Sequence, residues 1–290
     1  MSRNVEDKNK YREIKERRLE LKRAKDKRQG SLKIVLNATY GILNDKHSAM
    51  YDPLMAHSVT TYNQLFLLML IEMIEKECGD DAELIQSNTD GEYFQFKNME
   101  ALKKAEKCVA EWEKITRYEM ELDLAQKVIQ RDVNNYVLQM EDGSIKAKGA
   151  VVKKLQPLDY DLPVVNKAMK EYLINGTRFE DYIENENRLI EYQKIYKTTS
   201  NYKYAWHNNA AVKNKVNRVF ASTIETDTPF YKWKQDKETP DKFASTPDHV
   251  FIDNGDIRDK LVPSHLDKNW YIERCKSEYK KFTGEDYKDS

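Results

Sequence analysis

Three side chains that suit a nucleotide recur on one predicted helical face near the N-terminus. Lys33, Asn37 and Tyr40 occupy positions i, i+4 and i+7 of the run KIVLNATYG, so they share one side of a helix. The ammonium group can contact phosphate, the amide can bind polar edges, and the phenol ring can lie against a sugar. This face predicts nucleotide binding, with capping or packing of the helix end as the alternative interpretation.

A carboxylate further along the chain could hold a metal ion. Asp90 stands in the turn SNTDG, between two short runs that are rich in apolar and aromatic residues. This pattern predicts a β-hairpin with the carboxylate at its tip. A carboxylate on a rigid hairpin can bind Mg²⁺, which prefers fixed oxygen ligands. Asp-Gly is also an ordinary hairpin turn, so a plain turn residue is the alternative.

Taken together, the two segments resemble the family B DNA polymerases. KIVLNATYG is similar to the fingers motif Lys-x-x-x-Asn-Ser-x-Tyr-Gly, with Ala38 in the Ser place. SNTDG is similar to the palm motif Asp-Thr-Asp-Ser or Asp-Thr-Asp-Gly, with Asn88 in place of the first Asp. The resemblance is to the phage type and covers residues 10–155. It implies template-directed addition of deoxynucleotides to a primer 3′ end by two-metal phosphoryl transfer.

The resemblance implies a role for each motif residue. Asp90 is expected to be the catalytic metal ligand for Mg²⁺, and Asn88 to offer a carbonyl oxygen without charge. Lys33 is expected to contact the triphosphate and to stabilise the leaving pyrophosphate. Asn37 and Tyr40 are expected beneath the nascent base pair, where the ring excludes a 2′-hydroxyl.

Two further groups of residues are candidates for contact with substrates. Arg18 and Lys22 lie one turn apart on a predicted helix, as do an Arg and a Lys that face the triphosphate in the family; a solvated charged face is the alternative. After the palm motif, Tyr136 stands where the family has its primer-grip tyrosine. Lys146 and Lys148 lie in a Lys-x-x-Gly-like strand and are expected to contact primer phosphates, although exposed strands also carry lysines as edge protection.

The pattern of the whole chain predicts an α+β fold. Residues 1–47 are interpreted as a helical fingers hairpin, 48–154 as the C-terminal part of a palm, and 155–290 as a mostly helical thumb. Helices are expected at 5–28, from Ser31 to Gly41, and at 53–78, 99–117, 163–174, 179–196 and 266–282. Strands are expected at 83–96 as a hairpin, and at 125–131, 136–140 and 144–152.

Composition adds few constraints on function. The chain of 290 residues has 49 basic and 49 acidic residues, so no overall basic field indicates nucleic acid. Residues 1–33, however, hold thirteen Lys or Arg against six Asp or Glu. The three cysteines have no zinc-like or disulfide spacing, and the longest apolar run, 65–71, is short for a membrane helix. A cytoplasmic protein without membrane contact is expected.

One part of the resemblance is missing. The family supplies another carboxylate from an Asp-x-x-Ser-Leu-Tyr-Pro-like motif, and no such motif occurs here. The chain is therefore expected to be the C-terminal portion of a polymerase, incomplete alone, with primer-template DNA, dNTPs and an N-terminal polymerase portion as partners. The alternative is a non-catalytic DNA-binding or scaffold protein derived from a polymerase.

Overall fold

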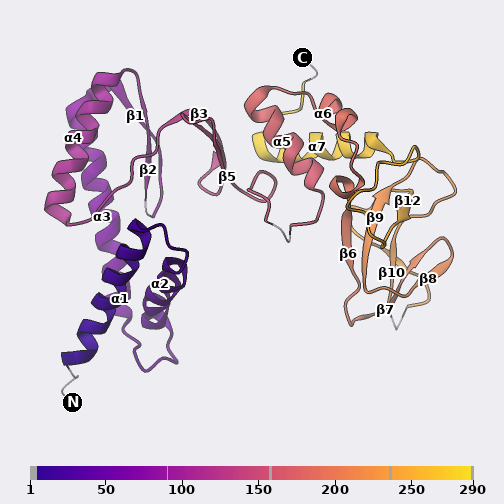
Figure 1. Cartoon of the computed structure of the whole chain (residues 1–290), viewed down its shortest axis with the longest axis horizontal. Coiled ribbons are helices and arrows are strands. Elements are labelled where there is room, and N and C mark those ends of the chain that lie inside the picture. The colour runs from indigo at the N-terminus through magenta and orange to yellow at the C-terminus, as the bar shows by residue number, and fades with distance from the viewer. Residues whose placement is uncertain (1–4, 90, 157–158, 235–236, 289–290) are drawn as a thin grey trace. The chain divides into compact units, whose positions relative to one another are not determined.

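The chain folds into two compact units, Met1–Glu121 and Leu122–Ser290, which are described here one at a time. Figure 1 shows the computed structural model, coloured from the N-terminus to the C-terminus. The structure describes residues 5–89, 91–156, 159–234 and 237–288. Helices and strands both occur in each unit, so the expected α+β class is confirmed.

The first unit is mainly helical and carries one β-hairpin. Its elements are α1 (Val5–Arg23), α2 (Gln29–Asn44), α3 (Pro53–Cys78), the 3₁₀ turn η1 (Gly79–Asp81), β1 (Ala82–Ser87), β2 (Glu92–Phe96) and α4 (Met99–Thr116). The strands pair antiparallel, which confirms the predicted hairpin. The predicted helix 53–78 is also confirmed with the same bounds.

Local capping explains where the long helices begin. Asp52 precedes Pro53, and its carboxylate accepts a hydrogen bond of 3.0 Å from the N–H of Met55. Asn98 caps α4 in the same way, because its Oδ1 accepts from the N–H of Ala101 at 2.9 Å. Each cap satisfies a backbone donor that would otherwise lack a partner within the helix.

The boundaries of the first two helices differ from the prediction. Helix α1 ends at Arg23 rather than residue 28, and α2 starts at Gln29 with no side-chain cap, so Ser31 lies inside α2. Helix α2 also continues through Gly41 to Asn44. A glycine inside a helix costs only about 1 kcal/mol relative to alanine, and the residues Ile42 and Leu43 that follow it can continue the helix.

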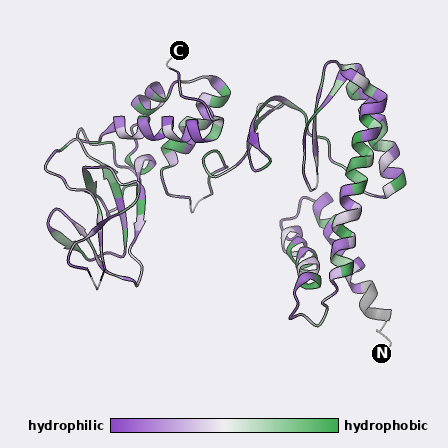
Figure 2. Ribbon diagram, turned by 180° about the vertical axis from the view of Figure 1, so that it is seen from behind, coloured by the Kyte–Doolittle hydropathy of each residue, from purple (hydrophilic) through white to green (hydrophobic). Residues whose placement is uncertain are grey.

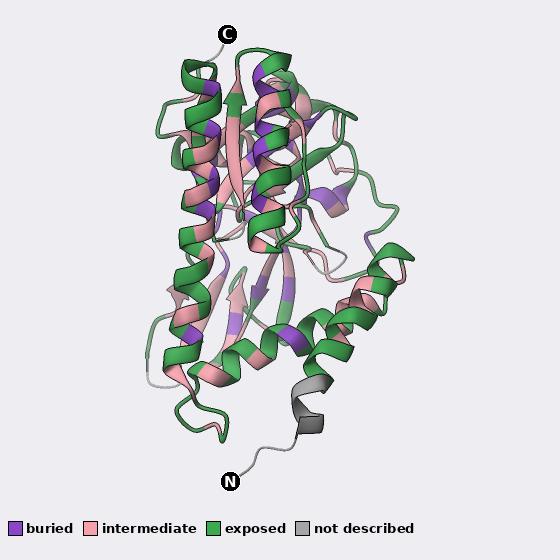
Figure 3. Cartoon of the chain, turned by 90° about the vertical axis from the view of Figure 1, so that its left-hand side faces the viewer, coloured by how far each residue is buried: buried purple, intermediate pink, exposed green. Residues whose placement is uncertain are grey.

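The core of this unit lies between α3, α4 and the hairpin. Trp112 of α4 is 2% exposed, and its indole N–H donates to the carbonyl of Phe66 at 2.7 Å. Leu70 and Ile74 of α3 are buried beside it, and Phe94 and Phe96 of β2 pack on the same cluster. Figure 3 shows the buried residues of α3 concentrated in the half that runs alongside α4.

The first half of α3 carries apolar side chains that the described residues leave exposed. Leu54 is 79% exposed, and Met55, Val59, Leu65 and Leu68 are exposed as well. Figure 2 shows hydrophobic residues recurring along α3. Among the described residues, Pro53–Asp81 is long and apolar enough to cross a membrane by length and composition. The second half of α3 packs in the core of this unit, and 17% of the apolar window is buried.

The second unit combines helices with three small sheets. Its elements are β3 (Ala125–Asp132), β4 (Asn135–Met140), β5 (Ile145–Lys148), α5 (Pro163–Asn175), α6 (Phe179–Asn185), the 3₁₀ turn η2 (Leu189–Tyr192), β6 (Lys194–Lys197), β7 (Tyr202–His207), β8 (Ala210–Val212), β9 (Val216–Ala221), β10 (Tyr231–Lys234), β11 (Asp241–Lys242), β12 (Val250–Ile252) and α7 (Lys268–Thr283). The sheet orders are β3-β4-β5, β12-β9-β6 and β11-β10-β7-β8. A large core cluster joins α5, α6 and α7 to the sheets, with Met169, Phe179, Phe220 and Tyr271 fully buried.

Three predictions for this part of the chain are wrong. The segment from residue 155 onward is not mostly helical, because strands β6 to β12 lie within it. The helix predicted at 179–196 ends at Asn185 and is followed by η2 and β6. The strand predicted at 144–152 is also shorter and ends at Lys148, since Gly149 leaves the strand with a φ of 121°.

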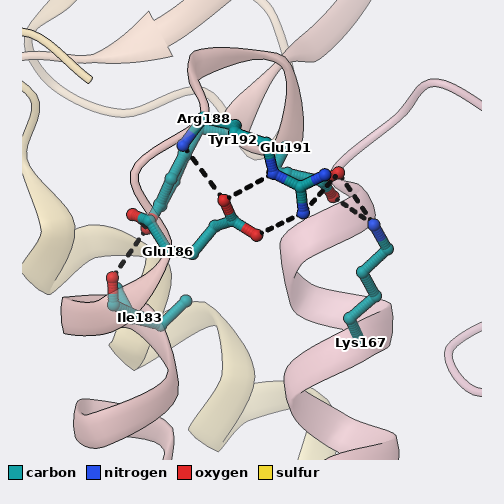
Figure 4. A network of polar contacts seen from close by, with 6 residues as sticks. All are labelled: Lys167, Ile183, Glu186, Arg188, Glu191 and Tyr192. Atoms are coloured by element: carbon teal, nitrogen blue, oxygen red, sulfur yellow. Dashed lines mark hydrogen bonds and ion pairs between the residues drawn. The ribbon is translucent and has the colours of Figure 1, made fainter. Parts of the chain in front are cut away.

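An ionic network explains why the helix stops at residue 185 (Figure 4). The guanidinium of Arg188 pairs with Glu186 at 2.7 Å and lies 3.4 Å from Glu191. Lys167 of α5 holds Glu191 at 2.7 Å, and the hydroxyl of Tyr192 donates to the carbonyl of Ile183 at 2.7 Å. These contacts require residues 186–192 to leave the α-helical conformation, and they link the 3₁₀ turn η2 to α5 and α6.

This network should make the stability of the second unit depend on pH. The hydrogen bond from Arg188 lowers the pKa of Glu186 below the usual value for a glutamate side chain. A lowered pKa contributes stability that is present above the unfolded-state pKa and is lost as pH falls through the folded-state value. We expect Arg188→Met to cost about 1 kcal/mol at pH 7, since solvent screens part of the charge-assisted bonds. The difference should shrink below pH 4.5.

Urea titrations of both proteins at pH 7 and pH 4 would measure this effect. Arg258→Met is the matched control, because Arg258 forms the same kind of pair with Asp256 at an exposed site. Little change is expected for the control at either pH. A loss for Arg188→Met that stays constant with pH would contradict the ionic origin of the stabilisation.

Candidate active site

The face of α2 that carries Lys33, Asn37 and Tyr40 is exposed to solvent. Tyr40 is 38% exposed, and Lys33 and Asn37 are exposed as well. Leu36 is the buried residue of α2, and its helical position borders this face, next to Lys33 and Tyr40. Within the described ranges, the three side chains make no hydrogen bond or ion pair. The helix therefore brings together the three predicted residues and leaves their polar groups available to a ligand.

The neighbouring helix α1 places its own candidates differently. Arg17 and Leu21 line a small cavity of about 250 Å³ together with residues at the start of α2. Arg18 and Lys22 stand one position further round α1. The ammonium group of Lys22 pairs with Glu121, and the Nε of Arg18 is buried without a hydrogen-bond partner among the described residues. Contact of Arg18 and Lys22 with a triphosphate stays a prediction.

The hairpin turn presents a second group of candidates. Asp90 lies outside the described residues. Asn88 is half-buried, and its backbone N–H donates to the carbonyl of Gly91 at 3.0 Å, which closes the turn. The two strands that were predicted on either side of residue 90 are therefore present and paired.

Glu92 is a carboxylate of this hairpin that sequence reasoning missed. It pairs across the hairpin with Ser87, next to Asn88. Both carboxylate oxygens are buried without a hydrogen-bond partner among the described residues, and burial raises the pKa of Glu92 to about 7. The sequence signal was a charge inside an otherwise apolar and aromatic run. A cation near Glu92 would favour its ionised form.

The donor chemistry at the hairpin tip fits a hard cation. No group of three His, Cys, Asp or Glu residues suited to a metal occurs in the part of the chain that the structure describes. Mg²⁺, however, is usually bound by one or two carboxylates together with waters and substrate phosphates. The oxygens of Asn88, Asp90 and Glu92 are of that kind, and the orphaned carboxylate of Glu92 is an acceptor in need of a partner.

A basic and aromatic face occurs in the second unit. Tyr136 of β4 is directly opposite Lys148 of β5, and Lys146 follows two residues along on the same face. Lys146 pairs with Asp123 at 2.6 Å at an exposed site, whereas Lys148 has no ion pair within the described residues. The sheet therefore brings the three predicted DNA-binding residues together.

Gly149 ends this strand in a conformation that only glycine adopts readily. Its φ is 121°, and an added Cβ would lie 2.6 Å from the Oδ1 of Asn135. Asn135 is held in turn by its Nδ2, which donates to Asp132 at 2.9 Å. Gly149 thus packs against the turn that immediately precedes Tyr136, and it helps to set the position of the basic and aromatic face.

Comparison with known proteins agrees with the motif resemblance. Residues 3–110 match the family model for DNA polymerase family B. Over 169 residues, 57% of this chain, the sequence is 24% identical to DNA polymerase 1 of Saccharolobus solfataricus. The aligned segment is 18% of that relative's length, so the chain spans less than a fifth of it. Both motifs, from Lys33 to Gly41 and from Gln86 to Gly91, lie inside the matched range.

The close approach at Gly149 leads to a testable expectation. Gly149→Ala should destabilise the second unit by about 2 kcal/mol, because the added methyl meets Asn135 and the backbone is strained. Weaker binding of duplex DNA should accompany the loss if this turn positions Tyr136. Urea titration and fluorescence anisotropy with a labelled duplex would measure the two effects.

Gly30→Ala is the control, since Gly30 lies in α2 and an added Cβ meets nothing within 4 Å. That change should be neutral or slightly stabilising. Equal stability of Gly149→Ala and the unmodified protein would contradict this expectation, because it would show that the turn at Asn135 accommodates the methyl group without loss of stability.

Proposed function

We propose that this chain supplies nucleotide-binding and metal-binding elements of a template-directed DNA polymerase that extends a primer 3′ end with deoxynucleotides. The observation that supports it best is the exposed, unpartnered face of Lys33, Asn37 and Tyr40 on α2, inside the range that matches the family model. In this proposal residues 1–47 are fingers, 48–154 the C-terminal part of a palm, and 155–290 a thumb.

Each residue of the α2 face has a part in binding the nucleotide. Lys33 donates to the triphosphate and offsets charge that builds on the leaving pyrophosphate. Asn37 lies one turn further along α2 and can hydrogen-bond polar edges of the nucleotide. Tyr40 presents a ring that packs against the sugar and excludes a 2′-hydroxyl. Arg18 and Lys22 add positive charge, and the exposed pair of Lys22 with Glu121 is weak enough for a phosphate to compete.

The hairpin tip is proposed to hold Mg²⁺ through Asp90, with Asn88 as a neutral oxygen ligand. When bound, two such ions lower the barrier by neutralising charge on the attacking and leaving oxygens. Phe94 and Phe96 of the following strand pack against the core, which supports a fixed base for the hairpin.

The basic face of the second unit is proposed to bind the primer strand. Lys148 and Lys146 act through phosphates, which positions DNA without reading its sequence. Tyr136 adds an aromatic surface opposite Lys148. Because the pair of Lys146 with Asp123 is exposed, a phosphate can replace the carboxylate.

A separate N-terminal polymerase portion is proposed to bring the other palm carboxylate. The exposed apolar residues in the first half of α3 suit a large apolar interface. The relative is also much longer than the segment that aligns with this chain. The competing proposal is a DNA-binding scaffold without catalysis, which Asn88 favours because it lacks the charge of a metal-binding Asp.

A pair of substitutions at the hairpin distinguishes these proposals. With Asp90→Ala, single-turnover incorporation by the complete enzyme should fall about a thousandfold or more, since charge stabilisation worth several kcal/mol is lost. Asn88→Ala should cost about tenfold or less, because a neutral ligand contributes less. Equal losses for the two variants would contradict the assignment, and a complete enzyme that adds no nucleotides with Mg²⁺ would favour the scaffold.

A second experiment tests Lys33 without requiring catalysis. Lys33→Ala should weaken binding of a fluorescent dNTP by about tenfold or more, because a charge-assisted hydrogen bond to phosphate is lost. Binding of duplex DNA should stay nearly constant. Lys46→Ala, another exposed lysine just beyond α2, is the matched control. Normal dNTP binding with weakened DNA binding would move Lys33 to the duplex.

A further inference from the structure

A cavity of about 1520 Å³ lies within the second unit, and its lining does not include Tyr136, Lys146 or Lys148. One wall is the β6–β9 sheet, and the others come from α5, α7 and the loop after β12. Its volume exceeds that of a typical small-molecule site. Neither the α2 face nor the hairpin tip contributes to it.

Cross-strand register places two cations side by side on the sheet wall. Ile195 pairs with Arg218, and Lys197 pairs with Val216. Paired residues and their i+2 neighbours project to one face of a sheet, so these four side chains share the face that lines the cavity. Lys197 and Arg218 are diagonal neighbours, whose Cβ atoms lie about 7 Å apart in such a pairing.

Lys197 and Arg218 are also the basic residues of this lining that form no ion pair within the described residues. The other basic side chains each form an ion pair of 2.5 to 2.8 Å with a lining carboxylate: Lys153–Asp159, Lys194–Asp161, Arg258–Asp256 and Arg274–Glu278. The guanidinium of Arg218 donates to the carbonyl of Gly255 at 3.1 Å, and its charge helps to lower the pKa of Asp256 without a direct ion pair. The lining thus retains about two positive charges.

Two buried amides on the other walls have unused hydrogen-bonding capacity. Asn166 of α5 is 5% exposed; its Nδ2 donates to the carbonyls of Val151 at 2.8 Å and Lys153 at 3.0 Å, and its Oδ1 has no donor among the described residues. Gln193 is 3% exposed, and its side-chain amide makes no hydrogen bond within the described ranges. A buried polar atom without a partner is rare in proteins, so the Oδ1 of Asn166 is an acceptor suited to a ligand.

We propose that this cavity binds a nucleoside monophosphate, with the phosphate at Lys197 and Arg218 and the base at Gln193 and Asn166. A phosphate monoester carries about two negative charges near neutral pH, which matches the two unpaired cations. The amide of Gln193 offers a donor and an acceptor to the edge of a base, and the Oδ1 of Asn166 offers a further acceptor. Ile195, Val216 and Ile257 provide apolar surface for the faces of the ring. The ligand is either a free nucleotide or the 5′-phosphorylated end of a strand.

Equilibrium binding of dAMP to the full chain tests this site. All titrations use the Lys33→Ala variant, so that nucleotide binding at the α2 face does not contribute. The result for the cavity is then independent of whether the proposed function of α2 is correct. We expect binding of one dAMP per chain, and at least tenfold weaker binding of deoxyadenosine, which lacks the phosphate. Lys197→Met and Arg218→Met should each weaken dAMP binding about tenfold. Gln193→Leu should weaken dAMP binding and leave inorganic phosphate binding unchanged.

Lys213→Met is the control, because Lys213 is exposed and lies outside the lining. A 5′-phosphorylated oligonucleotide is then used to compete with bound dAMP. If the oligonucleotide binds as tightly as dAMP or more tightly, the ligand is a strand end; if it binds more weakly, the ligand is a free nucleotide. No binding of either ligand would overturn the proposal. Binding that survives the Lys197, Arg218 and Gln193 substitutions unchanged would overturn it as well.

Discussion

The packing of α4 on the second half of α3 is the interaction on which the first unit depends. Trp112 fills the space between the two helices and fixes their register through its hydrogen bond to Phe66. The same cluster receives Phe94 and Phe96 of β2, so the hairpin strands are held by the core. A metal ligand needs such a rigid base, because Mg²⁺ tolerates little deviation in the geometry of its ligands. Since this core uses only the second half of α3, the first half retains an apolar surface that the described residues leave uncovered.

Helix α2 differs from α3 and α4, because it contributes little to the core of the first unit. Leu36 is its buried residue, while Lys33, Asn37 and Tyr40 face solvent. It packs against α1 and α3, and the N–H of Asp52 donates to the carbonyl of Leu43 at 3.0 Å at the end of α2. Since few of its side chains are buried, the polar residues of α2 remain in contact with solvent.

How far the sequence could predict the structure depends on whether the signals were local. Asp52 and Pro53 mark the start of α3 unambiguously, and the Asn98 cap and the hairpin turn are equally local. Strands β6 to β12 are two to six residues long, and their mixture of aromatic and basic residues has no clear period. The end of α6 depends on Arg188 meeting Glu186 and Glu191, a contact that becomes visible only in three dimensions. For the candidate site, α2 gathered the three motif residues as predicted, whereas the buried carboxylate of Glu92 depends on tertiary packing.

A net charge of zero conceals where this chain can bind anions, because what matters is which cations are paired. Several lysines and arginines of the second unit form short ion pairs with carboxylates, such as the pairs that line the cavity. Lys33, Lys148, Lys197 and Arg218 have no such partner in the described part of the chain, and each lies beside aromatic or amide groups that can bind the rest of a nucleotide. An unpaired cation at a structured site loses less on binding phosphate than one that must first leave a carboxylate. The pattern of pairing, rather than the total charge, therefore separates surfaces that only solvate the protein from surfaces suited to phosphate.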